Sequence, residues 1–169
     1  MIASGVRCFA HIKKLAVMGF IDIIMRLPQL MCLLMQSLYH AHRHRPCAIV
    51  LIDYPGFNLL LARCVKHLNI PILYYIAPKV WASRPRRIQT LKRCVDHLAV
   101  IFPFEVQLFQ DQGCTATYVG NPLSEITDTP ATDSTLRERL KAHPGTKTIA
   151  LLPGSRRSEW QRLYPLMME

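Results

Sequence analysis

Acidic residues are scarce in this chain of 169 residues, which has 11 Asp and Glu against 21 Lys and Arg. The resulting formal charge of +10 predicts a surface that attracts phosphate groups, nucleic acid or anionic lipid headgroups. Charge alone does not choose among these three partners. Hydrophobic residues make up 50% of the composition, which is ample for a packed core and argues against a disordered chain.

Several motifs that reveal common activities are absent. The chain has no GxGxxG pattern and no P-loop, which argues against those nucleotide-binding folds. It also has neither the GxSxG motif nor the HExxH motif, which argues against the common serine hydrolases and zinc hydrolases. The six cysteines include no CxxC pair and lie mostly in apolar runs, which indicates a reducing, cytosolic compartment. The first residues lack the features of a secretory signal.

Three histidines, His40, His42 and His44, alternate near the end of a predicted helix. Alternate residues on a helix point to different sides, and no cysteine or carboxylate cluster completes a coordination shell. The pattern therefore favours a solvated, helix-ending run over a metal site. We predict no metal and no cofactor.

Strands and helices alternate along the middle of the chain. We expect strands near 47–53, 71–76, 97–102 and 115–119, and helices near 58–68, 85–95 and 104–112. Such alternation with short connections indicates βαβ units and a parallel sheet. The predicted fold class is therefore α/β, with a Rossmann-like parallel sheet flanked by helices.

A short polar segment, residues 127–133, interrupts this pattern and is predicted to be a linker. It separates a first domain, residues 1–126, from residues 134–169, where we expect a strand at 148–152 and a helix near 158–168. A parallel strand with so few neighbours cannot bury both faces. The sequence is therefore expected to be a piece of a longer two-domain protein.

Asp53 follows an apolar run, residues 48–52, and precedes a turn. A run of this kind is typical of a strand buried on both faces, and in open α/β sheets the residue at its carboxyl end faces the ligand crevice. The alternative is that Asp53 caps the next helix or orders the turn, since Asp suits both roles. The local sequence alone leaves the two interpretations open.

The amino-terminal helix is more apolar than a core helix needs to be. From Leu15 to Leu27 its apolar residues cover roughly 220° of the helix surface, whereas a core-facing stripe needs about 100°. Pro28 is expected to end or kink this helix before a second apolar segment. A membrane span is the weaker interpretation, because an acid, an arginine and a proline lie inside the window. A core or interdomain helix and a helix inserted part way into a bilayer both stay open, and the second is favoured by flanking basic residues. These are Lys13, Lys14, Arg43 and Arg45.

Two other basic segments are candidates for anion binding. The first is the cluster Arg84, Arg86, Arg87, Lys92 and Arg93, which follows a predicted strand. Most such runs are solvated faces, although residues after a strand can reach the same crevice as Asp53. The turn at 154–156 is the better candidate, because backbone donors at a helix amino terminus and a guanidinium suit phosphate oxygens.

Six segments together resemble lipid-A-disaccharide synthases, in the order found in that family. They are residues 16–20 (AVMGF), 52–58 (IDYPGFN), 75–82 (YIAPKVWA), 103–105 (PFE), 119–123 (VGNPL) and 151–157 (LLPGSRR). The resemblance implies an inverting glycosyltransferase of GT-B fold with two facing Rossmann-like domains. Such an enzyme joins UDP-2,3-diacylglucosamine to 2,3-diacylglucosamine 1-phosphate and releases UDP. The implied location is cytoplasmic, peripheral on the inner face of the cytoplasmic membrane.

The resemblance also implies roles for particular residues. Asp53 would act as the general base on the acceptor hydroxyl, and Arg156 would help to hold the UDP leaving group. Substrate or phosphate binding is implied for Asn58, Asn121, Gly154 and Ser155. Membrane or acyl-chain contact is implied for Val17, Met18, Phe20, Ile21 and Ile24. The resemblance implies neither a metal nor a nucleic-acid partner.

The chain departs from the family pattern at three positions. Gly56 replaces a second acid, Ser83 replaces a tryptophan, and Asn121 stands where a histidine is usual. Asn121 keeps a hydrogen-bonding side chain but cannot transfer a proton, which counts against acid–base work at that turn. The family's Gly-rich first strand and most of its nucleotide-binding domain fall outside residues 1–169. We therefore expect a partial GT-B fold that is inactive alone.

Two other classes of function compete with the synthase. One is a non-catalytic, membrane-associated remnant that keeps lipid binding without sugar transfer. The other is a basic nucleic-acid-binding domain, which needs aromatic platforms among its basic residues. The aromatic residues of this chain lie mostly in apolar runs, so we rank the nucleic-acid class third and predict no nucleic-acid partner.

Overall fold

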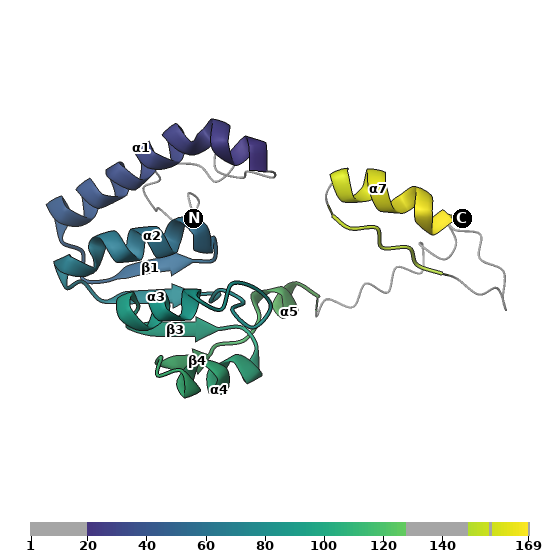
Figure 1. Ribbon diagram of the computed structural model, residues 1–169. Coiled ribbons are helices and arrows are strands. Elements are labelled where there is room, and N and C mark those ends of the chain that lie inside the picture. The colour runs from purple at the N-terminus through teal and green to yellow at the C-terminus, as the bar shows by residue number, and fades with distance from the viewer. Residues whose placement is uncertain (1–19, 128–148, 156, 169) are drawn as a thin grey trace. The chain divides into compact units, whose positions relative to one another are not determined.

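The computed structural model describes residues 20–127, 149–155 and 157–168. The chain divides into two compact units, Met1–Thr127 and Asp128–Glu169, and each unit is described by itself. The first unit contains the sheet (Figure 1). The family resemblance implies that residues 1–126 form the acceptor-side domain and that residues 134–169 begin the nucleotide-sugar-binding domain. This assignment stays a prediction.

The first unit is built on a four-stranded parallel sheet in the order β1-β2-β3-β4. Its strands are β1 (Ile49–Ile52), β2 (Ile72–Tyr75), β3 (His97–Val100) and β4 (Ala116–Tyr118). All four were expected from the alternating pattern, with slightly wider bounds. The predicted α/β class with a parallel sheet is confirmed.

Helices connect and flank these strands. They are α1 (Phe20–His44), α2 (Pro55–Val65), the 3-10 helix η3 (Lys66–Leu68), α3 (Arg87–Cys94), α4 (Pro103–Asp111) and α5 (Pro122–Thr127). Proline opens α2, α4 and α5, where its fixed φ suits the first turn and its missing N–H has no helical partner to lose. These prolines explain why α2 and α4 begin earlier than the apolar periodicity alone predicted.

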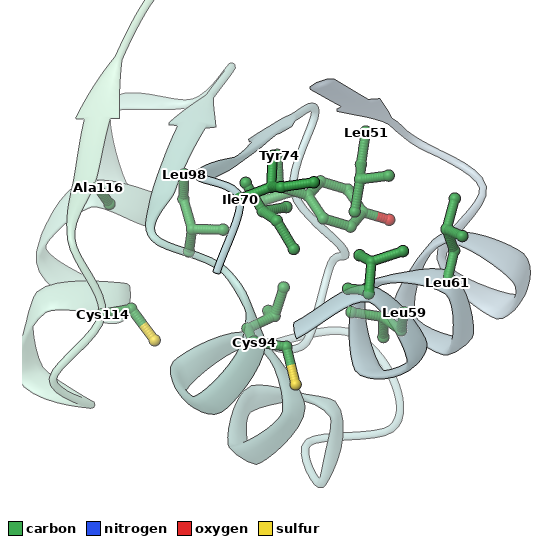
Figure 2. Packing of buried hydrophobic residues seen from close by; sticks show 14 of the residues in the cluster. Leu51, Leu59, Leu61, Ile70, Tyr74, Cys94, Leu98, Cys114 and Ala116 are labelled. Atoms are coloured by element: carbon green, nitrogen blue, oxygen red, sulfur yellow. The ribbon is translucent and has the colours of Figure 1, made fainter. Parts of the chain in front are cut away.

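The core lies between one face of the sheet and the connecting helices. The register places Leu51, Tyr74, Leu98 and Ala116 in one row across the four strands, and all four are buried. Residues of α2, α3 and α4 pack against this row, and Figure 2 shows part of the cluster. The buried helical residues include Leu59, Ala62, Val65, Leu91 and Phe109. Alternation along each strand therefore sets which side chains form the core.

The expectation that β1 is buried on both faces is wrong for the described residues. Leu51 is buried, but Val50 and Ile52, which point to the other face, are exposed. Within the described sheet β1 is an edge strand that pairs only with β2, and the core cluster covers only the face of Leu51. A continuous apolar run identifies a strand but does not show which neighbours cover it.

Of the two outcomes expected at Pro28, the end of a helix is not found, and a kink stays a prediction. α1 continues through Pro28 for a total of 25 residues. One side of α1 packs on the core through the buried Leu34 and Ala41. A second apolar side is exposed, with exposed fractions from 47% to 65%. We call its four residues the α1 stripe: Leu27, Met31, Met35 and Tyr39, spaced four apart on one side of the helix.

Among the residues that the structure describes, no helix combines the length and the apolar character needed to cross a membrane. Within the described residues, α1 packs in part against the core and leaves the α1 stripe exposed.

The second unit contains α7 (Arg157–Met168), as predicted from the sequence. The strand predicted at 148–152 is not found in its described part, where residues 149–152 are not in a strand and Ile149 and Leu152 are exposed. A parallel strand exists only through hydrogen bonds to a neighbouring strand, and none pairs with this segment among the described residues. The apolar sequence alone could not reveal this missing partner.

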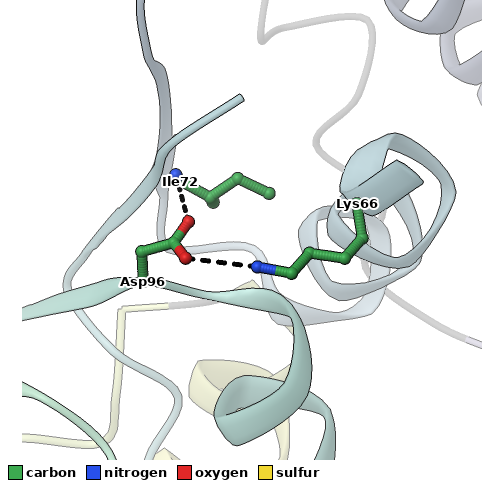
Figure 3. A network of polar contacts seen from close by, with 3 residues as sticks. All are labelled: Lys66, Ile72 and Asp96. Carbon is green, nitrogen blue, oxygen red and sulfur yellow. Dashed lines mark hydrogen bonds and ion pairs between the residues drawn. The ribbon is translucent and has the colours of Figure 1, made fainter. Parts of the chain in front are cut away.

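Asp96 ties the beginnings of β2 and β3 together (Figure 3). Its Oδ2 accepts a hydrogen bond of 2.8 Å from the Ile72 N–H, and its Oδ1 lies 3.2 Å from the Lys66 Nζ. Partial burial alone would raise the pKa of Asp96. The hydrogen bond from Ile72 and the charge of Lys66 outweigh this effect and keep the pKa below its usual value.

Replacing Asp96 with Ala should lower the free energy of unfolding by about 1 kcal/mol at neutral pH, because the Ile72 N–H loses its acceptor. The half-exposed Lys66 should matter less, so Lys66→Ala should cost at most about 1 kcal/mol. A carboxyl whose folded-state pKa is lowered stabilises the fold above its unfolded-state pKa, and this contribution disappears as the pH falls through the folded-state pKa. Urea unfolding across this range should show the gap between wild type and Asp96→Ala narrowing at acid pH. A gap independent of pH would contradict the ionic contribution.

Candidate functional site

The carboxyl ends of β1, β2 and β3 lie at the same edge of the sheet, because the strands are parallel neighbours. The register aligns Ile52 with Tyr75, and Tyr75 with Ala99. The segments that follow these strands therefore meet at one place, which we call the carboxyl edge. Ligands of open α/β sheets bind outside this edge.

Asp53 and Tyr54 form a strained turn at the end of β1. Both residues have φ of 45°, in the left-handed region that residues with a β-carbon rarely enter. Each such residue costs on the order of 1–2 kcal/mol. The amino-terminal cap of α2 is Tyr54, without a side-chain capping bond, so Asp53 is not the cap of this helix. The Asp53 side chain is exposed at the carboxyl edge.

Two buried side chains hold this turn, and we call them the Asn58–Tyr74 pair. The Nδ2 group of Asn58 donates to the Ile52 carbonyl at 3.0 Å and to the Asp53 carbonyl at 2.6 Å. The Tyr74 hydroxyl donates to the same Asp53 carbonyl at 2.7 Å. Asn58 was predicted to contact substrate, yet both its amide hydrogens are engaged with the backbone. A direct contact of Asn58 with substrate stays a prediction.

The pKa of the Tyr74 hydroxyl reflects two charged residues near this turn, Asp53 and Arg87. Burial raises the pKa of the Tyr74 hydroxyl, and the negative charge of Asp53 raises this pKa further. The neighbouring Asn58 amide and the positive charge of Arg87 act in the opposite direction but do not cancel the increase. Tyr74 therefore remains a protonated donor. Arg87, at the start of α3, brings one member of the predicted basic cluster to the carboxyl edge.

Three aromatic rings gather near the ends of β2 and β3, and we call them the aromatic platform. Trp81 and Phe104 meet edge to face with centroids 5.3 Å apart, while Phe102 and Phe104 stack at 5.7 Å. Trp81 is 48% exposed and Phe104 is 53% exposed. The Lys79 ammonium lies 5.5 Å from the centroid of the Phe102 ring.

Glu105 fixes this platform from below the surface. Its side chain is only 1% exposed, and its Oε1 accepts a hydrogen bond of 3.1 Å from the Trp81 indole N–H. Its Oε2 accepts from the Phe102 N–H at 3.3 Å, at the amino terminus of α4. In the sequence, Trp81 and Glu105 are notable only as parts of the segments shared with the family. Glu105 lies two residues after Pro103, which opens α4. This spacing is the sequence signal that predicts its hydrogen bond with the Phe102 N–H at the start of the helix.

The loop that carries Lys79 and Trp81 begins with another strained residue. Ile76 has φ of 59°, which for a β-branched residue is a clear outlier, and its N–H bonds to the Ala99 carbonyl at 3.1 Å. Strained backbone of this kind tends to gather at functional sites. Two adjacent strand ends, those of β1 and β2, thus carry non-glycine residues in the left-handed region.

Asn121 caps the short helix α5 after the end of β4. Its Oδ1 accepts a hydrogen bond of 3.0 Å from the Leu123 N–H, and its carbonyl accepts one from the Ser124 N–H at 3.0 Å. Gly120 before it has φ of 85°, where a β-carbon would be strained. The observed role of Asn121 is therefore to begin α5, and its predicted role in substrate binding stays a prediction.

The second unit contains the predicted phosphate turn in part. Gly154, with φ of 108°, and Ser155 are exposed and precede α7. They help to line a hollow of about 580 Å³ in which Trp160 and Tyr164 stack at 5.4 Å. Arg156 lies outside the described residues, as do Val17 and Met18. Phe20, Ile21 and Ile24 belong to α1, but their side chains also lie outside the described part.

The histidine run ends α1 as predicted from the sequence. His40 and His44 stack at 5.5 Å and line a hollow of about 450 Å³ with residues of β1 and α2. Within residues 20–127, 149–155 and 157–168, no group of three His, Cys, Asp or Glu side chains is arranged to hold a metal ion.

Known proteins match this chain along its whole length. A model of the lipid-A-disaccharide synthetase family matches residues 1–169. The lipid-A-disaccharide synthase of Myxococcus xanthus is 38% identical over 169 residues, which is 100% of this chain and 44% of that relative. The synthase of Thiobacillus denitrificans is 37% identical over 100% of this chain and 45% of its own length, and that of Anaeromyxobacter dehalogenans is 37% identical over 98% and 43%.

The chain therefore spans less than half the length of the curated relatives that it matches. Its parallel sheet agrees with the Rossmann-like domain that the sequence resemblance implied. Because the family match extends over all its residues, the chain belongs to the lipid-A-disaccharide synthetase family.

Proposed function

We propose that this chain provides the acceptor side of a lipid-A-disaccharide synthase. The reaction joins UDP-2,3-diacylglucosamine to 2,3-diacylglucosamine 1-phosphate and releases UDP. The observation that carries the proposal is the exposed Asp53 carboxylate, on a strained turn at the carboxyl edge of a parallel sheet. Since Asp53 does not cap α2, the capping part of the structural alternative for this residue does not apply.

Asp53 acts in this proposal as the general base. The acceptor hydroxyl forms the new bond to the anomeric carbon of the donor as the bond to UDP breaks, and the hydroxyl proton moves to Asp53. Arg156, with backbone donors of Gly154 and Ser155, stabilises the negative charge that develops on the leaving UDP. Asp53 and this turn belong to different units, as the two-domain architecture of the family requires.

The Asn58–Tyr74 pair gives the base a defined position. General-base catalysis depends on the distance and direction between the base and the proton that it removes. Three hydrogen bonds from two buried side chains fix the carbonyls at and before Asp53, so its backbone cannot relax to an unstrained conformation without breaking them. In this proposal Asn58 and Tyr74 are positioning residues.

The α1 stripe supports a second part of the proposal, peripheral binding to the inner face of the cytoplasmic membrane. Both substrates carry acyl chains, so the enzyme has to work at a lipid surface. Exposed apolar side chains at intervals of four residues form a surface that can enter the acyl boundary of a bilayer, and the net charge of +10 favours anionic headgroups. Val17, Met18, Phe20, Ile21 and Ile24 extend the same apolar sequence toward the amino terminus.

The α1 stripe also favours a second candidate function, a non-catalytic lipid-binding protein. Membrane binding through this stripe needs neither Asp53 nor the carboxyl edge. The two candidates therefore differ in whether the chain can support sugar transfer when it is joined to the rest of a synthase.

A chimera should test the catalytic proposal. Residues 1–169 would replace the matching segment of the Myxococcus xanthus synthase, and the chimera should form the disaccharide product with UDP release in a coupled assay. Asp53→Asn in this chimera should lower kcat by about 10²–10⁴-fold, since the general base is lost. The control is Asp111→Asn, another exposed acid, at the end of α4. Full activity of Asp53→Asn would contradict the base, whereas a folded but inactive parent chimera that binds vesicles would favour the lipid-binding candidate.

The positioning role predicts an unusual stability pattern around the turn. Asn58→Ala should lower the free energy of unfolding by about 1–3 kcal/mol, because the Ile52 and Asp53 carbonyls lose their donor. Tyr74→Phe should lower it by about 1 kcal/mol. Asp53→Asn should change it by less than about 0.5 kcal/mol, since its side chain is exposed. Urea unfolding followed by circular dichroism measures all three, and a loss for Asp53→Asn equal to that for Asn58→Ala would argue that the carboxylate itself supports the fold.

Serine at Met31, Met35 and Tyr39 together should release the chain from vesicles of anionic phospholipid without unfolding it, since all three side chains are exposed. The fraction that sediments with vesicles should fall several-fold, because the transferred apolar area is lost. Serine at Tyr118 and Val119, which are exposed on and after β4, is the matched control and should leave sedimentation unchanged. Serine at Val17, Phe20, Ile21 and Ile24 should act like the α1 variant. Equal sedimentation of the α1 variant and wild type would count against the membrane surface.

A further inference from the structure

The polar groups buried in this fold are concentrated at the carboxyl edge. Among the described residues only two polar or charged residues are buried, Asn58 and Glu105. Asn58 holds the turn of Asp53, and Glu105 holds the indole of Trp81. Burying a carboxylate costs free energy that hydrogen bonds must offset. The second buried group therefore indicates that the orientation of Trp81 matters as well.

The fixed orientation of the half-exposed rings Trp81 and Phe104 contributes little to packing of the core. Trp81 and Phe104 each expose about half of their surface, yet their rings are fixed edge to face, and the indole N–H is already bonded to Glu105. What remains accessible is ring surface, with a negative π face and no donor. Such a surface suits a partner that presents C–H groups, as one face of a hexose does.

A cation borders the same rings. The Lys79 ammonium lies over the Phe102 ring, and among the described residues it forms no ion pair with an acid. An ammonium near an accessible surface is a ready partner for a phosphate group. Ring surface and cation together fit a sugar that carries a phosphate better than they fit an acyl chain.

The spacing along the edge is suited to a single sugar. Asp53 follows β1, and Phe102 follows β3, with β2 between them. Neighbouring strands lie about 4.8 Å apart, so the strand ends that precede Asp53 and Phe102 are roughly 10 Å apart along the edge. This separation accommodates one hexose with its substituents.

We propose that the aromatic platform binds the sugar ring of the acceptor, with Lys79 against its phosphate, and so directs a sugar hydroxyl toward Asp53. The inference rests on the proposed function for the identity of the sugar. Within that function the UDP group of the donor belongs to the turn at Gly154 and Ser155, and the acyl chains belong to the α1 stripe. Other ligands could occupy the aromatic platform instead: a nucleobase, an acyl chain or the surface of another protein.

The chain offers a direct reporter, because Trp81 and Trp160 are its only tryptophans. In a Trp160→Phe background, Trp81 emission should change saturably when glucosamine 1-phosphate is titrated into the chain. Glucosamine should bind several-fold more weakly, and inorganic phosphate or UDP should leave the emission unchanged. An equal response to UDP or uridine would identify a nucleobase site and overturn the proposal, as would no saturable response to glucosamine 1-phosphate.

Substitutions should distinguish the contribution of the ring surface to sugar binding from that of the Lys79 ammonium. Phe104→Ala should weaken binding of glucosamine 1-phosphate about tenfold, whereas Tyr118→Ala, an exposed aromatic on β4, is the matched control and should not. Lys79→Ala leaves all three rings in place, so it keeps the proposal testable if Phe104→Ala disturbs the fold. It should remove the preference for the phosphorylated sugar over glucosamine. Retention of that preference would overturn the role of Lys79.

The chimera distinguishes this inference from the proposed function. Phe104→Ala and Lys79→Ala in the chimera should raise KM for the acceptor several-fold and leave KM for the donor unchanged. An active chimera in which neither variant changes the acceptor KM would overturn the platform while the function stands. An inactive chimera whose isolated chain still binds glucosamine 1-phosphate at Trp81 would overturn the function while the sugar site stands.

Discussion

The Asp53 carbonyl accepts hydrogen bonds from both Asn58 and Tyr74, and the rest of the candidate site depends on this arrangement. It fixes where β1 ends, makes two successive left-handed residues tolerable and starts α2 two residues later. Tyr74 is also a fully buried residue of the core row, so the turn is attached directly to the core. The exposed carboxylate thereby gains a position that an exposed loop residue would not have.

Glu105, which follows β3, is a second buried polar side chain that holds segments at the carboxyl edge by hydrogen bonds. Its two carboxylate oxygens join the loop after β2 to the start of α4, just as Asn58 and Tyr74 join the turn after β1 to α2 and β2. Elsewhere the described core is apolar, and its side chains come from one face of the sheet and the helices over it. Packing thus supplies the stability of the fold, whereas the few buried polar groups determine the geometry at the carboxyl edge.

The sequence predicted the elements well because its signals are local. Apolar runs and the alternation of strand and helix segments identified the four strands and the helices α2, α3 and α4 of the first unit. The burial of both faces of β1 and the strand at 148–152 failed because both depend on neighbours that a local pattern does not contain. Asp53 and the 154–156 turn could be proposed from the sequence. The bond between Trp81 and Glu105 could not, since it joins residues 24 apart through the packing of α4.

Backbone strain gives an independent reason to place function at this edge. Of the six non-glycine residues with positive φ in the described chain, Asp53, Tyr54, Ile76 and Arg84 follow β1 and β2. Glycine would adopt these conformations without a β-carbon clash, as it does at Gly113, Gly120 and Gly154. A turn needed only to reverse the chain would be less strained with glycine at positions 53 and 54. The side chains at the carboxyl edge therefore have to contribute something that offsets the strain, and a base beside an oriented ring surface is such a contribution.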